Sequence, residues 1–105
     1  MTIRTALIPV LTAVVMASPV VAAESAKETC GYQADVVAAI QQARLDRVKE
    51  RDLSDVLITD ETSWPENYNA AIPLIAPWIY DQKMKVIRNE DLGAVWNEQC
   101  LAQSQ

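Results

Sequence analysis

The sequence contains no histidine among its 105 residues. Histidine is the commonest general base and metal ligand, and the side chain whose charge changes near neutral pH. A nucleophilic serine or threonine would therefore lack its usual base partner, and no nucleotide-binding motif occurs in the chain. We predict a protein that is not an enzyme, needs no cofactor and binds no metal.

Long apolar runs are also scarce, and the main one stands at the N-terminus. Met1–Thr5 carries one positive charge, Ala6–Met16 is almost wholly apolar, and Ala17–Ala23 consists of small residues. This order is typical of a secretory signal peptide, cleaved before Glu24 or one residue earlier. The apolar run is about half of the ~20 residues that a membrane anchor requires. We expect a signal peptide over 1–23, a single mature domain over 24–105 with no membrane span, and bacterial-type export to the periplasm or exterior.

Positive charge is in short supply in the mature part. Without Arg4 it has 8 of the 9 Lys and Arg residues against 14 Asp and Glu, a net charge of −6. Nucleic acids and anionic lipid surfaces are bound by neutralising phosphate with Lys or Arg. The composition argues against both classes of partner.

Only two cysteines are present, Cys30 and Cys100, near the two ends of the mature chain. They are too distant in sequence for a C-x-x-C redox motif, and a metal site would need two further ligands. An even number of cysteines in an exported chain favours a disulfide. Closing a loop of this length stabilises a fold by about 4–4.5 kcal/mol in the loop-entropy model. We further expect Gly31 to allow a close helix approach, and Trp96 to be buried near Val37 or Tyr32.

Apolar spacing predicts an all-α fold of about four helical segments, two of them short. Asp52–Ser63 fits either one helical turn capped by Ser54 or a short extended piece, and we favour the turn. A break is expected around Ile72–Ala76, because Pro73 and Pro77 remove backbone donors. Asn89 is the expected N-cap of the last helix, although Gly93 could instead terminate the helix before it. The expected helices cover Gln33–Arg51, Pro65–Ala71, about Pro77–Arg88, and a last segment lined by Leu92, Val95, Trp96 and Cys100.

The disulfide also constrains the topology. It would join the start of the first helix to the end of the last. In an up-down bundle these two ends meet only after an even number of passes. This is why we expect four segments, or a last helix that lies across the bundle.

Four aromatic residues are candidates for partner binding: Trp64, Tyr68, Trp78 and Tyr80. Tyrosine and tryptophan dominate binding hot spots, but in a chain without Phe they could equally fill the core. Trp78 and Tyr80 are roughly 200° apart on a helix, which predicts that one of the two is exposed.

Charged clusters offer weaker candidates. Paired carboxylates can hold calcium or perform acid–base chemistry, but the spacing here lacks the calcium-loop pattern and favours a solvated face. A basic group after the proline-rich region suits a helix C-terminus. The acidic cluster comprises Asp52, Asp55, Asp60, Glu61 and Glu66, and the basic group Lys83, Lys85 and Arg88.

These features favour a non-enzymatic interaction module that binds an unidentified protein partner outside the cytoplasm. Short, exported and closed by one disulfide, the chain resembles in outline the small helical periplasmic acid-stress chaperones. The resemblance covers architecture only and implies no site residue. It supports an alternative function as a stress chaperone that loosens when its 14 acids titrate at low pH.

Overall fold

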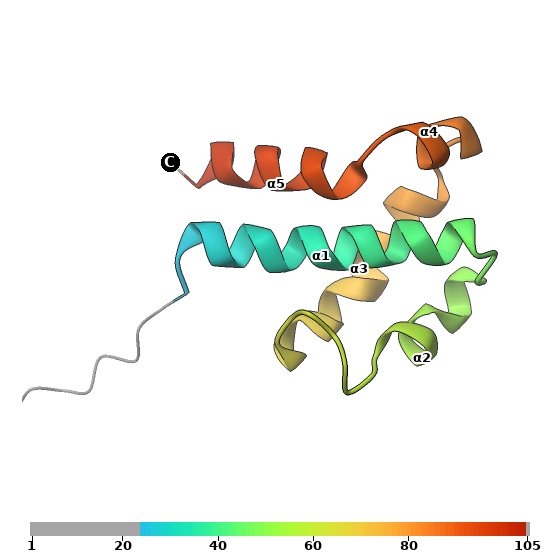
Figure 1. The fold of residues 1–105 in the computed structure, drawn as a ribbon, viewed down its shortest axis with the longest axis horizontal. Coiled ribbons are helices and arrows are strands. Elements are labelled where there is room, and N and C mark those ends of the chain that lie inside the picture. Colours follow the sequence, from blue (N-terminus) through green and yellow to red (C-terminus); the bar gives the residue numbers. More distant parts are fainter. Residues whose placement is uncertain (1–23, 105) are drawn as a thin grey trace, which may run out of the picture.

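The structure is a computed structural model that describes residues 24–104; the predicted signal peptide lies outside these residues. The described chain is all-α (Figure 1). α5 runs antiparallel to α1. The helices that come between α1 and α5 in the sequence fold back on α1. The elements are α1 (Ala26–Leu45), the 3-10 turn η1 (Glu50–Asp52), α2 (Leu53–Leu57), the 3-10 turn η2 (Glu66–Ala70), α3 (Ala71–Tyr80), α4 (Met84–Asn89) and α5 (Leu92–Gln103).

The first helix begins seven residues and ends six residues earlier than the predicted Gln33–Arg51. At its start, the Ser25 hydroxyl accepts a hydrogen bond from the backbone N–H of Glu28 at 3.2 Å, which is an N-cap. At its end, Arg47 has a positive φ of 64°, and the N–H of Val48 reaches back to the carbonyl of Ala43. This is the usual left-handed helix ending, here without the glycine that normally marks it.

α3 is continuous where the sequence predicted a break over Ile72–Ala76, so that prediction is wrong. Pro73 lies in the first turn of the helix, where a missing N–H removes no intrahelical bond. Pro77 does lie in the helix interior, which costs about 3 kcal/mol. Burial of three isoleucines on one face, at roughly 1.5–3 kcal/mol each, outweighs that cost. They are Ile72, Ile75 and Ile79.

The remaining boundaries follow the prediction in part. The expected helical turn after Asp52 is present as α2, but Ser54 lies inside it and does not cap it. The helix predicted over Pro77–Arg88 is two helices, α3 and α4, separated by a turn at Asp81–Lys83. Asp91, not Asn89, is the N-cap of α5 and accepts from the N–H of Ala94 at 3.0 Å. Gly93 is therefore in the first turn of α5 and does not terminate the helix before it.

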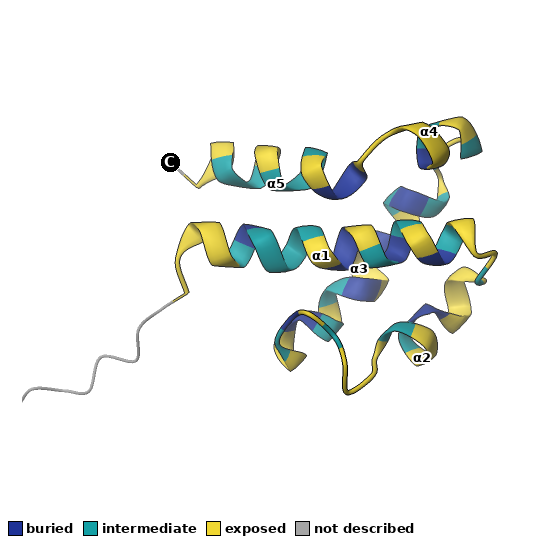
Figure 2. Ribbon diagram, in the orientation of Figure 1, coloured by how far each residue is buried: buried dark blue, intermediate teal, exposed yellow. Residues whose placement is uncertain are grey.

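The core lies between α1, α3 and the adjoining short elements (Figure 2). Among residues 24–104, none of the buried side chains is polar or charged. α1 contributes its apolar face, and Leu53 and Ile87 close the core from α2 and α4. The innermost residues are Val36, Val37, Ile40, Leu53, Ile72, Ile79 and Ile87.

Two polar side chains of α1 hold the chain turns that follow α3 and α4. The Gln41 amide donates to the carbonyls of Ile87 (2.8 Å) and Glu90 (2.7 Å) and accepts from the N–H of Leu92 (3.2 Å). The Arg44 guanidinium donates to the carbonyls of Tyr80 and Gln82 at the end of α3. Helix-end carbonyls, which lack intrahelical partners, are thus satisfied from α1.

The glycine at which α1 and α5 approach closely is Gly93, not Gly31 as predicted. A Cβ added to Gly93 would lie 2.9 Å from the carbonyl oxygen of Ala34 and 3.3 Å from the Cβ of Ala38. A Cβ added to Gly31 would meet nothing within 4 Å. The glycine needed for helix packing is therefore the one in the last helix.

Candidate functional site

Cys30 and Cys100 form the predicted disulfide, with their Cα atoms 5.6 Å apart. The bond joins the first turns of α1 to the last turns of α5, which confirms the closure expected from sequence. Cys30 is buried, whereas Cys100 is only partly covered. The disulfide thus fixes the antiparallel pair of helices at the end where the pockets described below are found.

Trp64 and Tyr68, two of the four aromatic candidates, are buried in the core. The Trp64 Nε1 donates to the side chain of Asn69 at 2.8 Å. The Tyr68 hydroxyl donates to Glu24 at 2.5 Å. This hydrogen bond to a carboxylate, together with burial, raises the pKa of Tyr68 above its usual value. Packing of the fold accounts for Trp64, whereas Tyr68 also lines a pocket described below.

Trp78 and Tyr80 are both half-buried, so the prediction that one of them is exposed is wrong. Trp78 packs against Trp96 of α5, with ring centroids 5.6 Å apart. Tyr80 donates to the carbonyl of Val48 at 2.5 Å, and Arg44 lies over its ring. The side of α3 that carries Trp78 packs against α5, and the side that carries Tyr80 packs against the end of α1 and the residues after it. Both side chains are therefore partly covered.

The charged clusters remain on the surface. All five residues of the acidic cluster are exposed, as are Lys83, Lys85 and Arg88. Among residues 24–104, no three Asp, Glu or Cys side chains come close enough to hold a metal ion. None of the helices in the same range is long and apolar enough to cross a membrane.

Gln33 of α1 and Trp96 of α5 form the centre of the candidate site. The Trp96 Nε1 donates to the Gln33 Oε1 at 2.9 Å. The sequence predicted Trp96 buried; it is half-buried. A pocket opens on each side of this pair, and both pockets include Gln33 and Trp96 in their walls.

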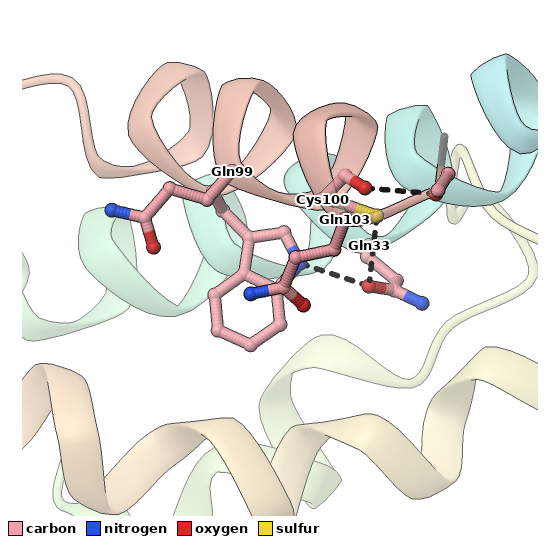
Figure 3. A pocket seen from close by; sticks show the side chains of 6 residues that line it. Gln33, Gln99, Cys100 and Gln103 are labelled. Atoms are coloured by element: carbon pink, nitrogen blue, oxygen red, sulfur yellow. Dashed lines mark hydrogen bonds between the residues drawn. The ribbon is translucent and has the colours of Figure 1, made fainter.

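The first pocket, of about 450 Å³, lies between α1 and α5 next to the disulfide. Figure 3 shows Gln33 beneath the last turns of α5, while the side chain of Gln99 points away from it. The walls are polar amides, the indole and a cystine sulfur. Its lining comprises Gln33, Trp96, Gln99, Cys100, Gln103 and Ser104.

The second pocket, of about 430 Å³, is bounded by α1, η2, α3 and α5, and we call it the Leu74 pocket. Its lining is mainly apolar, and Tyr68 is its one titratable residue, with the hydroxyl already bonded to Glu24. Leu74 stands at its edge with 80% of its surface exposed. The lining residues are Thr29, Gln33, Asn67, Tyr68, Ala71, Leu74, Ile75 and Trp96.

The outward side of α3 continues this apolar surface. Pro73, Leu74 and Pro77 are all exposed, and the helix contains no charged residue. A helix that is apolar all round is usually buried on every side, and contiguous exposed apolar surface marks interaction sites. Tyr68 is the one sequence candidate that lines the Leu74 pocket, and sequence reasoning missed the exposed apolar surface around Leu74. Its one signal was the run Ala70–Tyr80, which has no polar side chain except the Tyr80 hydroxyl.

The chain matches no protein-family model, and it has no match among the curated proteins or the solved structures.

Proposed function

We propose that the mature chain is an exported, non-enzymatic interaction protein that binds an apolar segment of a partner protein at the Leu74 pocket. The observation that carries the proposal is the 80% exposure of Leu74 beside an apolar pocket. Burying a leucine side chain contributes roughly 1.5–3 kcal/mol of favourable free energy. A bound apolar segment that covers Leu74 would gain this free energy.

The chemistry of the pocket supports binding over catalysis. Amides, hydroxyls and apolar side chains line it, and Tyr68, its titratable residue, is already hydrogen-bonded to Glu24. Residues with strongly shifted pKa values and a free nucleophile usually mark catalytic sites. The lining described here offers apolar area and neutral hydrogen-bonding groups, which suit a protein segment.

Export is part of the same proposal. It is supported by the signal-like order of residues 1–23 and by the Cys30–Cys100 disulfide, because disulfides persist in oxidising compartments such as the periplasm. The partner would then be a protein of the periplasm or of the exterior.

Site-specific photo-crosslinking in the native organism tests the function. A photoreactive residue is placed at Leu74 and, as the matched control, at Val56 of α2, an apolar residue that is 48% exposed. We expect a discrete adduct from position 74 and none from position 56. The purified partner should then bind the wild type at least about tenfold more tightly than Leu74→Ser, a difference of about 1.4 kcal/mol.

Two other outcomes would redirect the proposal. Identical adducts at both positions would show that Leu74 marks no site. Adducts with many unrelated proteins, appearing only at low pH, would favour the stress-chaperone alternative.

A further inference from the structure

Apart from the α-amino group that cleavage before Glu24 creates, the charged side chains closest to the Leu74 pocket are acidic. Glu24 lies on its rim: its carboxylate accepts hydrogen bonds from two lining residues, Tyr68 at 2.5 Å and Thr29 at 3.4 Å. Glu66 is exposed next to the lining residue Asn67. Among residues 24–104, no lysine or arginine lines the pocket.

The sequence explains this polarity. From Asp52 to Gln82 the chain has six acidic residues and no lysine or arginine, and this stretch supplies η2 and α3. α5, the opposite wall, contains Glu98 and no cation. Of the elements that form the pocket, η2 and α5 thus carry one acidic residue each and no cation, and α3 carries no charge.

Lys27 is the one cation in the N-terminal half of α1, and it faces elsewhere. It is two residues from Thr29, or about 200° around the helix. It lines a separate hollow together with Gly31 and Asp35. The other cations of α1 and of the following turn begin at Arg44, at the far end of the helix from the pocket (Figure 1).

Resting on the function proposed above, we infer that the occupant of the Leu74 pocket is a basic amphipathic segment of another protein. Its apolar side chains cover Leu74 and fill the pocket. Its lysines or arginines face Glu24 and the acidic residues of the neighbouring elements. Charge complementarity of this kind steers association and selects partners.

The same charges disfavour two other occupants. A second copy of this chain would bring two acidic surfaces together, and like charges at an interface are unfavourable. Anionic membranes attract basic segments. The pocket has no lysine or arginine in its lining and would therefore not attract an anionic membrane. Both are therefore outcomes that would overturn the inference.

Fluorescence anisotropy with designed peptides tests it on the purified mature chain. Two labelled helical peptides share one leucine-rich face and carry either lysines or glutamates on the other; a third carries lysines and serines only. We expect the lysine–leucine peptide to bind at least about tenfold more tightly than the glutamate–leucine peptide. Its affinity should fall at about 0.5 M salt, because salt screens exposed charges. The lysine–serine peptide should not bind.

Variants separate the pocket from general attraction to an acidic protein. Leu74→Ser should lower the affinity for the lysine–leucine peptide at least about tenfold. Val56→Ser changes an exposed apolar residue elsewhere and should leave this affinity unchanged. Glu24→Gln keeps an acceptor for Tyr68 but removes the charge, so it should narrow the preference for lysine over glutamate. Circular dichroism confirms that each variant is folded.

The failures are distinguishable. If both leucine-rich peptides bind equally and Leu74→Ser abolishes both, the charge preference is wrong while the pocket remains a binding site. The inference of a basic occupant is wrong if neither peptide binds, or if Val56→Ser weakens binding as much as Leu74→Ser. The proposed function is then tested separately, by the crosslinking at Leu74. A dimer that Leu74→Ser dissociates, or binding to vesicles of phosphatidylglycerol and phosphatidylcholine that Leu74→Ser abolishes, also overturns it.

Discussion

A Cβ on Gly93 would lie 2.9 Å from the carbonyl oxygen of Ala34, a distance that real Cβ atoms do not tolerate. Because the obstructing atom belongs to the backbone of α1, it cannot move aside as a flexible side chain would. The antiparallel packing of α1 and α5 therefore depends on the absence of a side chain at this position.

Gly93→Ala should destabilise the domain by about 1–3 kcal/mol, the usual effect of overpacking. Gly31→Ala is the matched control, since its Cβ meets nothing within 4 Å. Gly31 lies within the second turn of α1, and this second change should stabilise the fold by roughly 0.5–1 kcal/mol, because alanine favours helix over glycine. Urea denaturation of both variants measures the effect, and a tolerated Gly93→Ala would refute the close approach.

Reduction of the Cys30–Cys100 bond should lower the free energy of unfolding by about 4 kcal/mol. The bond closes a separation of 70 residues, and the loop-entropy model gives this value for such a length. Urea denaturation with and without a reductant, and of the Cys30→Ser/Cys100→Ser double variant, checks it. Two free thiols in the protein purified without reductant would contradict the premise.

The bundle and its closure could be predicted from sequence because they depend on local and compositional signals. Apolar residues at helical spacing predicted α1, and the even cysteine count predicted the bond between the two terminal helices. Ser25 and Glu28 have the S-x-x-E spacing of a capping box, and the helix begins directly after Ser25, seven residues before the predicted Gln33. At this helix the cap signal placed the start better than the first apolar residue did.

Other features depend on tertiary contacts that no local pattern contains. α1 ends at an arginine in the left-handed region, without glycine or proline nearby to signal it. α3 continues through Pro77 because its isoleucines are buried against α1. The Leu74 pocket exists only where four elements meet, so the single residue Leu74 gave no sign of it.

Gln41, a half-buried polar residue of α1, should contribute strongly to stability. Its amide makes three hydrogen bonds to the backbone around the α4–α5 connection. Gln41→Ala leaves those groups without partners and should cost roughly 1–3 kcal/mol. The control is Gln42→Ala, because Gln42 bonds only Asp46 at 3.1 Å on the surface and its loss should stay within about 0.5 kcal/mol. Equal effects in chemical denaturation would argue against the role of Gln41.

Leu74 and its neighbour Ile75 should differ sharply in their contribution to stability. Leu74→Ser should change the free energy of unfolding by less than about 0.5 kcal/mol, since 80% of the side chain is exposed. Ile75→Ala should cost roughly 2–5 kcal/mol, since Ile75 is 6% exposed. Thermal or urea denaturation distinguishes them. A large loss for Leu74→Ser would mean that the residue serves the fold and is not held free for a partner.

The domain should lose stability in alkali through Tyr80 and Tyr68. Burial raises the pKa of Tyr80 above its reference of 10.0, and the hydrogen bond to Glu24 followed by burial raises the pKa of Tyr68. The folded state therefore holds both phenolic protons more tightly than the unfolded chain does. The resulting stabilisation is fully present below pH 10 and is lost as the pH rises from there through the higher folded pKa values.

Tyr80→Phe and Tyr68→Phe test this assignment. At neutral pH each should cost roughly 0.5–1.5 kcal/mol, because each removes one hydrogen bond, that of Tyr80 to the carbonyl of Val48 and that of Tyr68 to Glu24. Above about pH 10, the reference pKa of tyrosine, the double variant should lose stability less steeply than the wild type. Lysine titration affects both proteins alike, so the difference in slope isolates the two phenols. The free energy of unfolding is measured by urea denaturation from neutral to alkaline pH. If it falls equally steeply with pH in both proteins, folding does not raise the pKa of either tyrosine.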